Sequence, residues 1–289
     1  MSGRLILIAD DFALSDGVSR AICDLAEDGR LSGTSALVTQ PGWQRGSTAL
    51  RPLRERLAVG LHFNLTLGTP LGAMPHFAAS GVFPNLGTVV RATLTGRIPA
   101  KEIEAEFNRQ LNVFEAAWGS PPDFIDGHQH VHVFPQIRDC VFRILQSRPG
   151  FRGLFLRDPS DSLRSVIRRG VSPLKAIYIS HLARGFGRRA RQLGFLTNDS
   201  FAGISSFDPA KVALEFARSA TRPGQRHLVM CHPGYADGAL ATADPMGQRR
   251  QSEFDFLAAD NDFAKMVWSP HRAKDGTIVW PGSGNTSDA

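Results

Sequence analysis

The sequence predicts an α/β fold in which parallel strands alternate with helices. Two apolar segments of strand length, residues 5–9 and 34–39, flank a helical pattern at residues 16–27 that Gly29 can end. The alternation continues along the chain, with strands expected at 59–65, 124–126, 153–156 and 227–231 and helices at 101–118, 136–146 and 209–220. Such alternation favours helical crossovers between parallel strands, either closed into a barrel or left as an open sheet.

The length of 289 residues favours one large domain, expected over residues 1–281. Residues 69–99 are rich in Gly and Pro and lack clean periodicity, which predicts a long insertion or lid near the site. Residues 161–193 form a basic helical segment. The small and polar residues 282–289 are expected to be a flexible tail.

The bulk composition is that of an ordinary globular protein, with 42% apolar and 21% charged residues. No apolar run reaches the roughly 18 residues of a membrane-spanning helix, and the first residues resemble a strand more than a signal sequence. The three cysteines are scattered and form no Cys-x-x-Cys pair, so we expect them to be reduced and mostly buried. These features predict a cytoplasmic protein.

Carboxylates and histidines follow several of the expected strands. Asp10 and Asp11 come directly after the first one, where one could bind metal and the other act as a base. The alternative is that one Asp only caps the following helix. His62 lies in the apolar run Gly60-Leu61-His62-Phe63-Asn64, where a lone imidazole is more often a hydrogen-bonded core residue.

The densest cluster of metal-binding side chains is Asp126-Gly127-His128-Gln129-His130-Val131-His132. In an extended conformation Asp126, His128, His130 and His132 project to one side, yet three histidines in so short a span cannot all reach one metal without bending. We expect His128 to be a ligand and the others to orient it, polarise substrate or pack around it. The alternative is a surface histidine tract, which the apolar flanks disfavour.

His232 ends another apolar strand, and the Pro233-Gly234 turn fixes the chain beyond it, so this imidazole is either catalytic or structural. A site with two imidazoles and one carboxylate suits a divalent metal that generates a hydroxide-like nucleophile, which predicts hydrolysis. Phosphate-binding glycine loops and a Gly-x-Ser-x-Gly elbow are absent from the sequence, which argues against dinucleotide, P-loop and serine-hydrolase enzymes.

Four motifs together resemble the YdjC-like carbohydrate deacetylases, a family that includes chitooligosaccharide deacetylase and hopanoid-associated deacetylases. They are Ala9-Asp10-Asp11-Phe12, Gly60-Leu61-His62-Phe63, the Asp126–His132 cluster and Cys231-His232-Pro233-Gly234. The match runs in the same order over roughly residues 4 to 235. The resemblance implies a single-domain, distorted (β/α) TIM-like barrel with mainly parallel strands, and removal of acetyl groups from an N-acetylated sugar.

The resemblance also implies roles for individual residues. The metal is expected to be Mg²⁺, with Zn²⁺ or another transition metal as alternatives. Asp10 resembles the general base and His232 the acid that protonates the departing amine, which an unperturbed pKa near 6.5 permits. The ligands would be Asp11, His62 and His128, and the residues that bind substrate or support the ligands would be Asn64, Asp126, His130 and His132.

Two features depart from the compact members of the family. Ala13 stands where Gly is common, and at a positive φ it costs about 1 kcal/mol or more. Residues 164–191 carry eight Arg or Lys side chains, which are either a solvated helix face or a contact for a membrane surface or an anionic, lipid-linked substrate. This longer basic segment is more similar to that of the hopanoid-associated members. Contact with a membrane would make the protein peripheral to the inner face of the membrane.

Other functions compete with a deacetylase. The same ligands would serve a metal-dependent hydrolase of another amide or of a phosphoester. A catalytically silent carbohydrate-binding protein is a second alternative. Nucleic-acid binding is disfavoured because the basic residues are not interleaved with a reading motif. A homodimer is also among the expectations.

Overall fold

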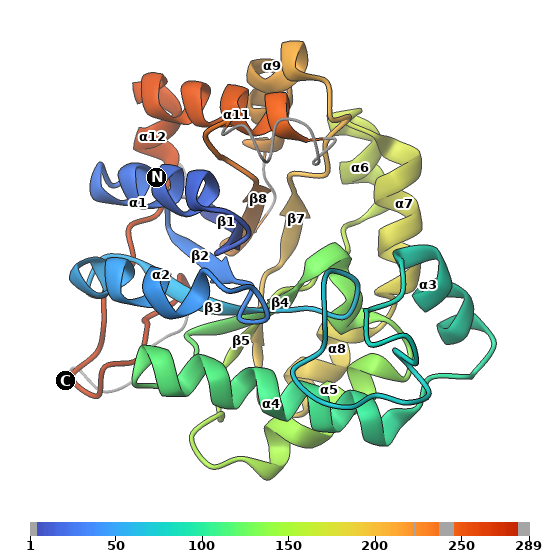
Figure 1. Cartoon of the computed structure of the whole chain (residues 1–289). Helices are drawn as coiled ribbons and strands as arrows, with labels where there is room; N and C mark the ends of the chain where they lie inside the picture. The colour runs from blue at the N-terminus through green and yellow to red at the C-terminus, as the bar shows by residue number, and fades with distance from the viewer. Residues whose placement is uncertain (1–4, 222–223, 237–245, 283–289) are drawn as a thin grey trace.

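The computed structural model describes residues 5–221, 224–236 and 246–282, and it has a parallel sheet curled into a half-barrel with helices outside it (Figure 1). The strand order is β6-β5-β4-β3-β2-β1-β8-β7, and all seven strand pairs are parallel. This confirms the predicted α/β class and the distorted barrel. The strands are β1 (Ile6–Phe12), β2 (Gly33–Ala36), β3 (Ala58–Phe63), β4 (Phe124–Gly127), β5 (Phe155–Leu156), β6 (Leu196–Thr197), β7 (Ser200–Ala202) and β8 (His227–Cys231).

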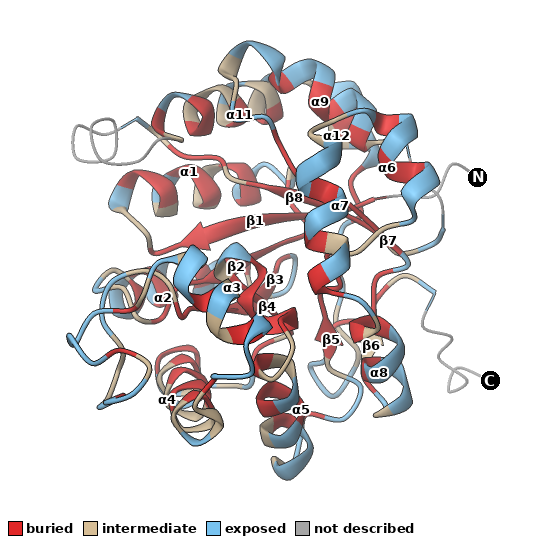
Figure 2. Ribbon diagram, turned by 90° about the vertical axis from the view of Figure 1, so that its right-hand side faces the viewer, coloured by how far each residue is buried: buried red, intermediate tan, exposed pale blue. Residues whose placement is uncertain are grey.

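Helices connect the strands and cover the sheet (Figures 1 and 2). They are α1 (Asp16–Glu27), α2 (Trp43–Leu50), α3 (Leu86–Leu94), α4 (Ala100–Trp118), α5 (Ile137–Ser147), α6 (Leu163–Arg169), α7 (Pro173–Leu182), α8 (Phe186–Gln192), α9 (Val212–Ser219), α11 (Gly247–Ala259) and α12 (Asn261–Met266), with 3₁₀ turns at Arg51–Leu53, His128–Val133 and Pro209–Lys211. In the described part of the chain, no helix is both long and apolar enough to cross a membrane.

The first strand and helix form where the sequence predicts them. Every residue of β1 is buried, as expected for a parallel strand covered on both faces. Helix α1 has the predicted bounds because Ser15 caps its first turn, its side chain accepting from the Val18 N–H, and because buried Val18, Ile22 and Leu25 share one face.

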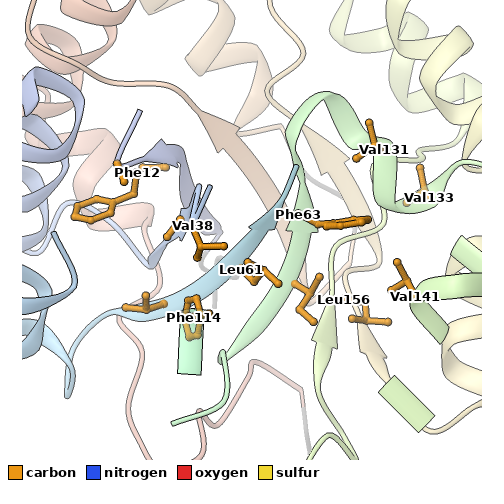
Figure 3. Packing of buried hydrophobic residues seen from close by; sticks show 14 of the residues in the cluster. Phe12, Val38, Leu61, Phe63, Phe114, Val131, Val133, Val141 and Leu156 are labelled. Atoms are coloured by element: carbon orange, nitrogen blue, oxygen red, sulfur yellow. The ribbon is translucent and has the colours of Figure 1, made fainter. Parts of the chain in front are cut away.

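The main hydrophobic core lies between the sheet and its outer helices. Leu61 and Phe63 of β3 belong to the same buried cluster as Phe114 of α4 and Val141 of α5 (Figure 3). On the opposite side of β3 the Phe124 ring packs closely against Gly60. A Cβ atom at this position would lie 2.6 Å from the ring, so only glycine fits there. The predicted close approach of the backbone at this glycine is therefore present.

Several predicted boundaries differ from the structure. Strand β2 ends at Ala36 rather than at residue 39, and the helix expected at 209–220 is a 3₁₀ turn followed by α9. The basic helical segment 161–193 contains three short helices, α6, α7 and α8. Residues 283–289 of the expected tail lie outside the described residues.

The expected insertion, residues 69–99, contains helix α3 and is attached to α4 by polar contacts. The Leu71 N–H donates to Glu106 Oε1 at 3.1 Å, and the Phe77 N–H donates to Glu102 Oε2 at 2.9 Å. Phe83 is buried, so the segment also contributes to the core. Its role as a lid stays a prediction.

Candidate metal centre and active site

The carboxyl ends of β1, β3, β4, β5 and β8 lie at one edge of the sheet because all these strands are parallel. At the end of β1 the pairing with β2 shifts register, and Asp11 has a φ of 66°. Ala13 has a φ of 74°, which is the positive φ considered for this position. An alanine in this conformation costs about 1 kcal/mol relative to glycine. The Ala13 N–H donates to Ser19 Oγ at 3.1 Å, which holds this strained turn against α1.

The structure brings together the three predicted metal ligands. Oδ1 of Asp11 lies 3.3 Å from Nε2 of His62 and 3.0 Å from Nδ1 of His128. One ligand atom from each residue can be chosen so that all three lie within 4.8 Å of one another. Two imidazole nitrogens and a carboxylate oxygen facing a common point are a donor set that fits a divalent cation with open positions.

The His62 imidazole is oriented by its other nitrogen. Nδ1 lies 2.7 Å from Oδ1 of Asp126 and 3.0 Å from Oγ of Ser35, so an Nδ1–H can donate to the carboxylate and Nε2 is left to face Asp11. A carboxylate behind a histidine in this way fixes the ring of a metal ligand. Burial alone would lower the pKa of His62, but Asp126, Asp10 and Asp11 outweigh it and raise the pKa to about 10. The carboxylates around His62 therefore favour positive charge at Nε2, which either a proton or a bound cation would supply.

Arg157 follows β5 and neutralises two of the carboxylates. Its Nη1 lies 2.7 Å from Oδ2 of Asp10 and its Nη2 lies 2.5 Å from Oδ1, a bidentate pair, and Nη2 also pairs with Asp126. All three side chains are buried. Arg157 and His62 hold the pKa of Asp126 below its usual value although burial acts in the opposite direction. One charged network therefore links four side chains in the order His62, Asp126, Arg157 and Asp10.

His232 lies beyond β8, and its backbone N–H donates to Oε2 of Glu253 at 2.6 Å. Within the described residues, its ring Nδ1 has no hydrogen-bond partner. Burial of the ring lowers the pKa of His232 to about 4, although Asp10 and Asp11 act in the opposite direction. The imidazole is therefore neutral at neutral pH, and its pKa lies below the unperturbed value near 6.5 that was expected from the sequence.

Helix α11 contributes a second arginine to the site. Nη2 of Arg250 lies 2.7 Å from Oδ2 of Asp11, the oxygen that does not face the histidines. Although burial raises the pKa of Asp11, Arg250 and His128 together hold it well below its usual range. Asp11 is thus ionised, as a metal ligand must be.

The histidine cluster is bent rather than extended. Strand β4 ends at Gly127, and the 3₁₀ segment His128–Val133 that follows has a kink, because Gln129 and His130 have non-helical φ values of 53° and 61°. This turn separates the side chains. His132 Nε2 hydrogen-bonds to the Arg157 carbonyl oxygen at 2.8 Å, and the His130 ring packs against Phe201. Both histidines are buried, which also excludes a surface tract.

Comparison with known proteins shows to which family this chain is related. The model of the YdjC-like protein family matches residues 4–267, which is most of the sequence. The chain belongs to the YdjC-like family. This confirms the resemblance found from the four motifs, and the match extends past them to include helix α11 and Arg250.

Several proteins and one solved structure are similar to this chain over half of its length or more. A Klebsiella pneumoniae protein named chitooligosaccharide deacetylase is 32% identical over 90% of this chain and 92% of its own length, and a Serratia marcescens protein of the same name is 38% identical over 83% and 85%. A Proteus mirabilis protein of that name matches at 38% over 51% of this chain and 57% of its own length. An Enterococcus faecalis structure, named for a proposed role in cellobiose-phosphate cleavage, shares the fold with a TM-score of 0.66 at 20% identity, over 92% of this chain and 94% of that one.

In this YdjC-like protein Asn64 shapes the turn after β3. Its Oδ1 accepts from the Thr66 and Leu67 N–H groups at 3.1 and 3.0 Å, and its Nδ2 donates to Thr39 Oγ1 and to the Leu67 carbonyl oxygen at 2.8 and 2.7 Å. Asn64 is fully buried, so its amide is engaged within the protein. The substrate-binding role expected for it stays a prediction.

Sequence reasoning missed Ser35, Arg157, Arg250 and Glu253. Arg157 has a local signal, because it directly follows the apolar strand β5, as the candidate Asp and His residues follow theirs. Arg250 and Glu253 lie one turn apart on α11, a helix that the sequence analysis did not predict. Their pairing with Asp11 and His232 depends on the tertiary structure alone.

Proposed function

We propose that this YdjC-like protein is a metal-dependent deacetylase that hydrolyses the acetamide of an N-acetylated carbohydrate. The convergence of Asp11, His62 and His128 at one edge of the sheet is the observation that carries the proposal. The names of the relatives from Klebsiella pneumoniae and Serratia marcescens support the carbohydrate substrate. Asp10 lies near the carboxyl end of β1 and His232 directly follows β8, which pairs with β1, so both lie at the same edge.

Asp11, His62 and His128 would hold the metal. When bound, the cation would polarise the acetamide carbonyl and lower the pKa of water. Mg²⁺ is the metal that the family resemblance implies, whereas two imidazole ligands are more typical of Zn²⁺ and other transition metals. Asp126 and Ser35 would keep Nε2 of His62 directed toward the site.

Asp10 would act as the general base that takes a proton from the attacking water. Arg157 holds both oxygens of Asp10 in a fixed orientation and balances its charge in the buried site. Each oxygen of Asp10 accepts one hydrogen bond from Arg157 and keeps a second lone pair that can take the proton, while the guanidinium remains paired with Asp126. In this mechanism Arg157 positions Asp10 and does not touch the substrate.

His232 would give a proton to the departing amine. The ring is neutral in the free protein because its pKa is about 4, so the imidazole must gain its proton during the reaction. The proton that Asp10 takes from the attacking water would be passed on to His232 and from there to the departing amine, so that no further proton source is needed. The Asp10 and Asp11 carboxylates favour the protonated ring, and the unpartnered Nδ1 can accept the proton. The backbone contact with Glu253 fixes the position of His232 at the end of β8.

The test is to incubate the protein with N-acetylated chitooligosaccharides and to measure acetate and free amine together. Removal of metal by a chelator should abolish release, and single additions of Mg²⁺, Zn²⁺, Mn²⁺ and Co²⁺ should identify the effective ion. Asp10→Asn should lower turnover at least about 10²-fold while metal binding is retained. The absence of acetate with every substrate and metal would overturn the proposal, and release of phosphate from phosphoesters alone would replace it.

Two finer expectations belong to the same proposal. One is a cytoplasmic location, with which the three free cysteines are compatible. The other is that the N-acetylated sugar is attached to a lipid. Comparing a soluble oligosaccharide with the same sugar on a lipid anchor would test the second expectation, since a lipid-linked substrate should have the higher kcat/KM.

A further inference from the structure

Helices α6 and α7 expose large hydrophobic side chains to solvent. Of the ten such side chains that are exposed among the described residues, five lie on these two helices: Leu163, Ile167, Leu174, Ile177 and Tyr178. The side chain of Leu174 is 83% exposed. Helix α7 also buries Ala176, Ile179 and Leu182, so it is apolar toward both the core and the solvent. A helix of this kind is unusual on the surface of a globular protein, where the outer face is normally polar.

Phe207, which follows β7, extends this surface. The ammonium group of Lys175 lies 3.8 Å from the centre of the Phe207 ring, and this cation–π contact joins α7 to the segment that leads to α9. We name the exposed residues of α6, α7 and Phe207 the apolar–basic face. Figure 2 shows α6 and α7 with most of their outer surface exposed.

The charge on this part of the chain has one sign. Residues 162–198 contain eight Arg or Lys side chains and no Asp or Glu. Arg164, Arg168 and Lys175 are exposed beside the hydrophobic side chains. Nearby acidic groups are already paired, Asp161 with Arg169, Asp208 with Lys211, and Glu215, which lies close enough to act on Lys175, with Arg249. The apolar–basic face therefore has a strong positive charge that its own neighbours do not neutralise.

We propose that the apolar–basic face binds an anionic lipid surface. Exposed Leu, Ile and Tyr side chains can enter the boundary between headgroups and acyl chains, and each Arg or Lys beside them is attracted to the negative surface. A nucleic acid would satisfy the charges but leave Leu174 exposed. A second copy of the chain that docked through the same face would bring two clusters of cations together, and their repulsion would oppose the dimer.

The experiment is sedimentation of the full chain with lipid vesicles, compared between pure phosphatidylcholine and an equimolar mixture with phosphatidylglycerol. We expect binding to the anionic vesicles only, decreasing with salt. Leu174→Ser and the double variant Arg164→Gln/Arg168→Gln should each weaken partitioning at least about fivefold. This experiment involves no turnover, so its outcome is independent of the proposed deacetylase activity.

Helix α3 offers a matched control, because Leu94 is 66% exposed and Arg91 and Arg97 are exposed beside it. Leu94→Ser and Arg91→Gln/Arg97→Gln should leave vesicle binding unchanged. Absence of binding to anionic vesicles overturns the proposal, as does equal weakening by the α3 and α6–α7 variants. A dimer that Leu174→Ser converts to monomers, with no vesicle binding, would assign the face to a second copy instead.

Discussion

Arg250 and Asp11 form a buried ion pair in which Nη2 of the arginine lies 2.7 Å from Oδ2 of the aspartate, while Oδ1 of the same carboxylate faces His62 and His128. The two partners come from opposite ends of the chain. Arg250 thereby decides which oxygen of Asp11 is presented to the two histidines. Arg250 also offsets the negative charge of Asp11, a residue whose backbone has a strained φ of 66°.

Arg250→Gln should therefore weaken metal binding by about 10- to 100-fold, because the Asp11 carboxylate loses the partner that orients it. The measurement is the dissociation constant for Mn²⁺ or Zn²⁺ by titration calorimetry, which requires no activity. Arg250→Lys, which keeps the charge but not the fork, should give an intermediate value. An unchanged dissociation constant in Arg250→Gln would show that Asp11 is held by other groups.

Arg157→Ala should lower the free energy of unfolding by about 3–5 kcal/mol, because Asp10 and Asp126 would be left buried without their partner. Urea denaturation followed by circular dichroism measures this change. Arg45→Ala is the control, since Arg45 pairs with Asp16 at an exposed site and its removal should have little effect. A similar small effect for Arg157→Ala would contradict the network described here.

Gly60→Ala should destabilise the protein by about 1–3 kcal/mol, because the new Cβ atom would lie 2.6 Å from the Phe124 ring. The double variant Gly60→Ala/Phe124→Leu tests the cause, since it replaces the ring with a smaller side chain. If the clash explains the effect, Gly60→Ala should cost less in the Phe124→Leu background than in the native protein. Equal costs in the two backgrounds would place the cause elsewhere.

Stability should decrease between about pH 6.5 and pH 4 in part because of His132. Burial lowers the pKa of this histidine from 6.5 to about 4, so in this window the unfolded chain binds a proton that the folded protein does not. The stabilisation is full above pH 6.5 and is lost as the pH falls toward 4, by about 3 kcal/mol at most.

His132→Gln isolates this contribution. Glutamine can still donate to the Arg157 carbonyl oxygen but does not titrate, so the stability of the variant should depend less on pH between 6.5 and 4. Unfolding free energies of both proteins at several pH values provide the comparison. Parallel profiles would mean that His132 is not responsible.

The sequence predicted the elements whose signals are local. Helix α1 agrees with its predicted bounds because Ser15 and the spacing of Val18, Ile22 and Leu25 are all within the helix or next to it. Strand β8 agrees as well because the apolar run 227–231 is followed at once by His232-Pro233-Gly234. The short strands β6 and β7, with two and three residues, have no comparable signal and were missed.

The sequence by itself determined the α/β class, because the alternation of apolar strands and helices is a local pattern, and its four motifs marked Asp11, His62 and His128 as candidate ligands through their resemblance to the YdjC-like family. Only the tertiary structure decided how these residues are held. Arg157 is 147 residues from Asp10, and Arg250 is 239 residues from Asp11, so each pairing depends on the curling of the whole sheet. The positive φ values at Gln129 and His130 likewise bend the chain, and His130 and His132 are buried beyond this bend. Backbone conformation and long-range charge pairing are properties of the folded chain.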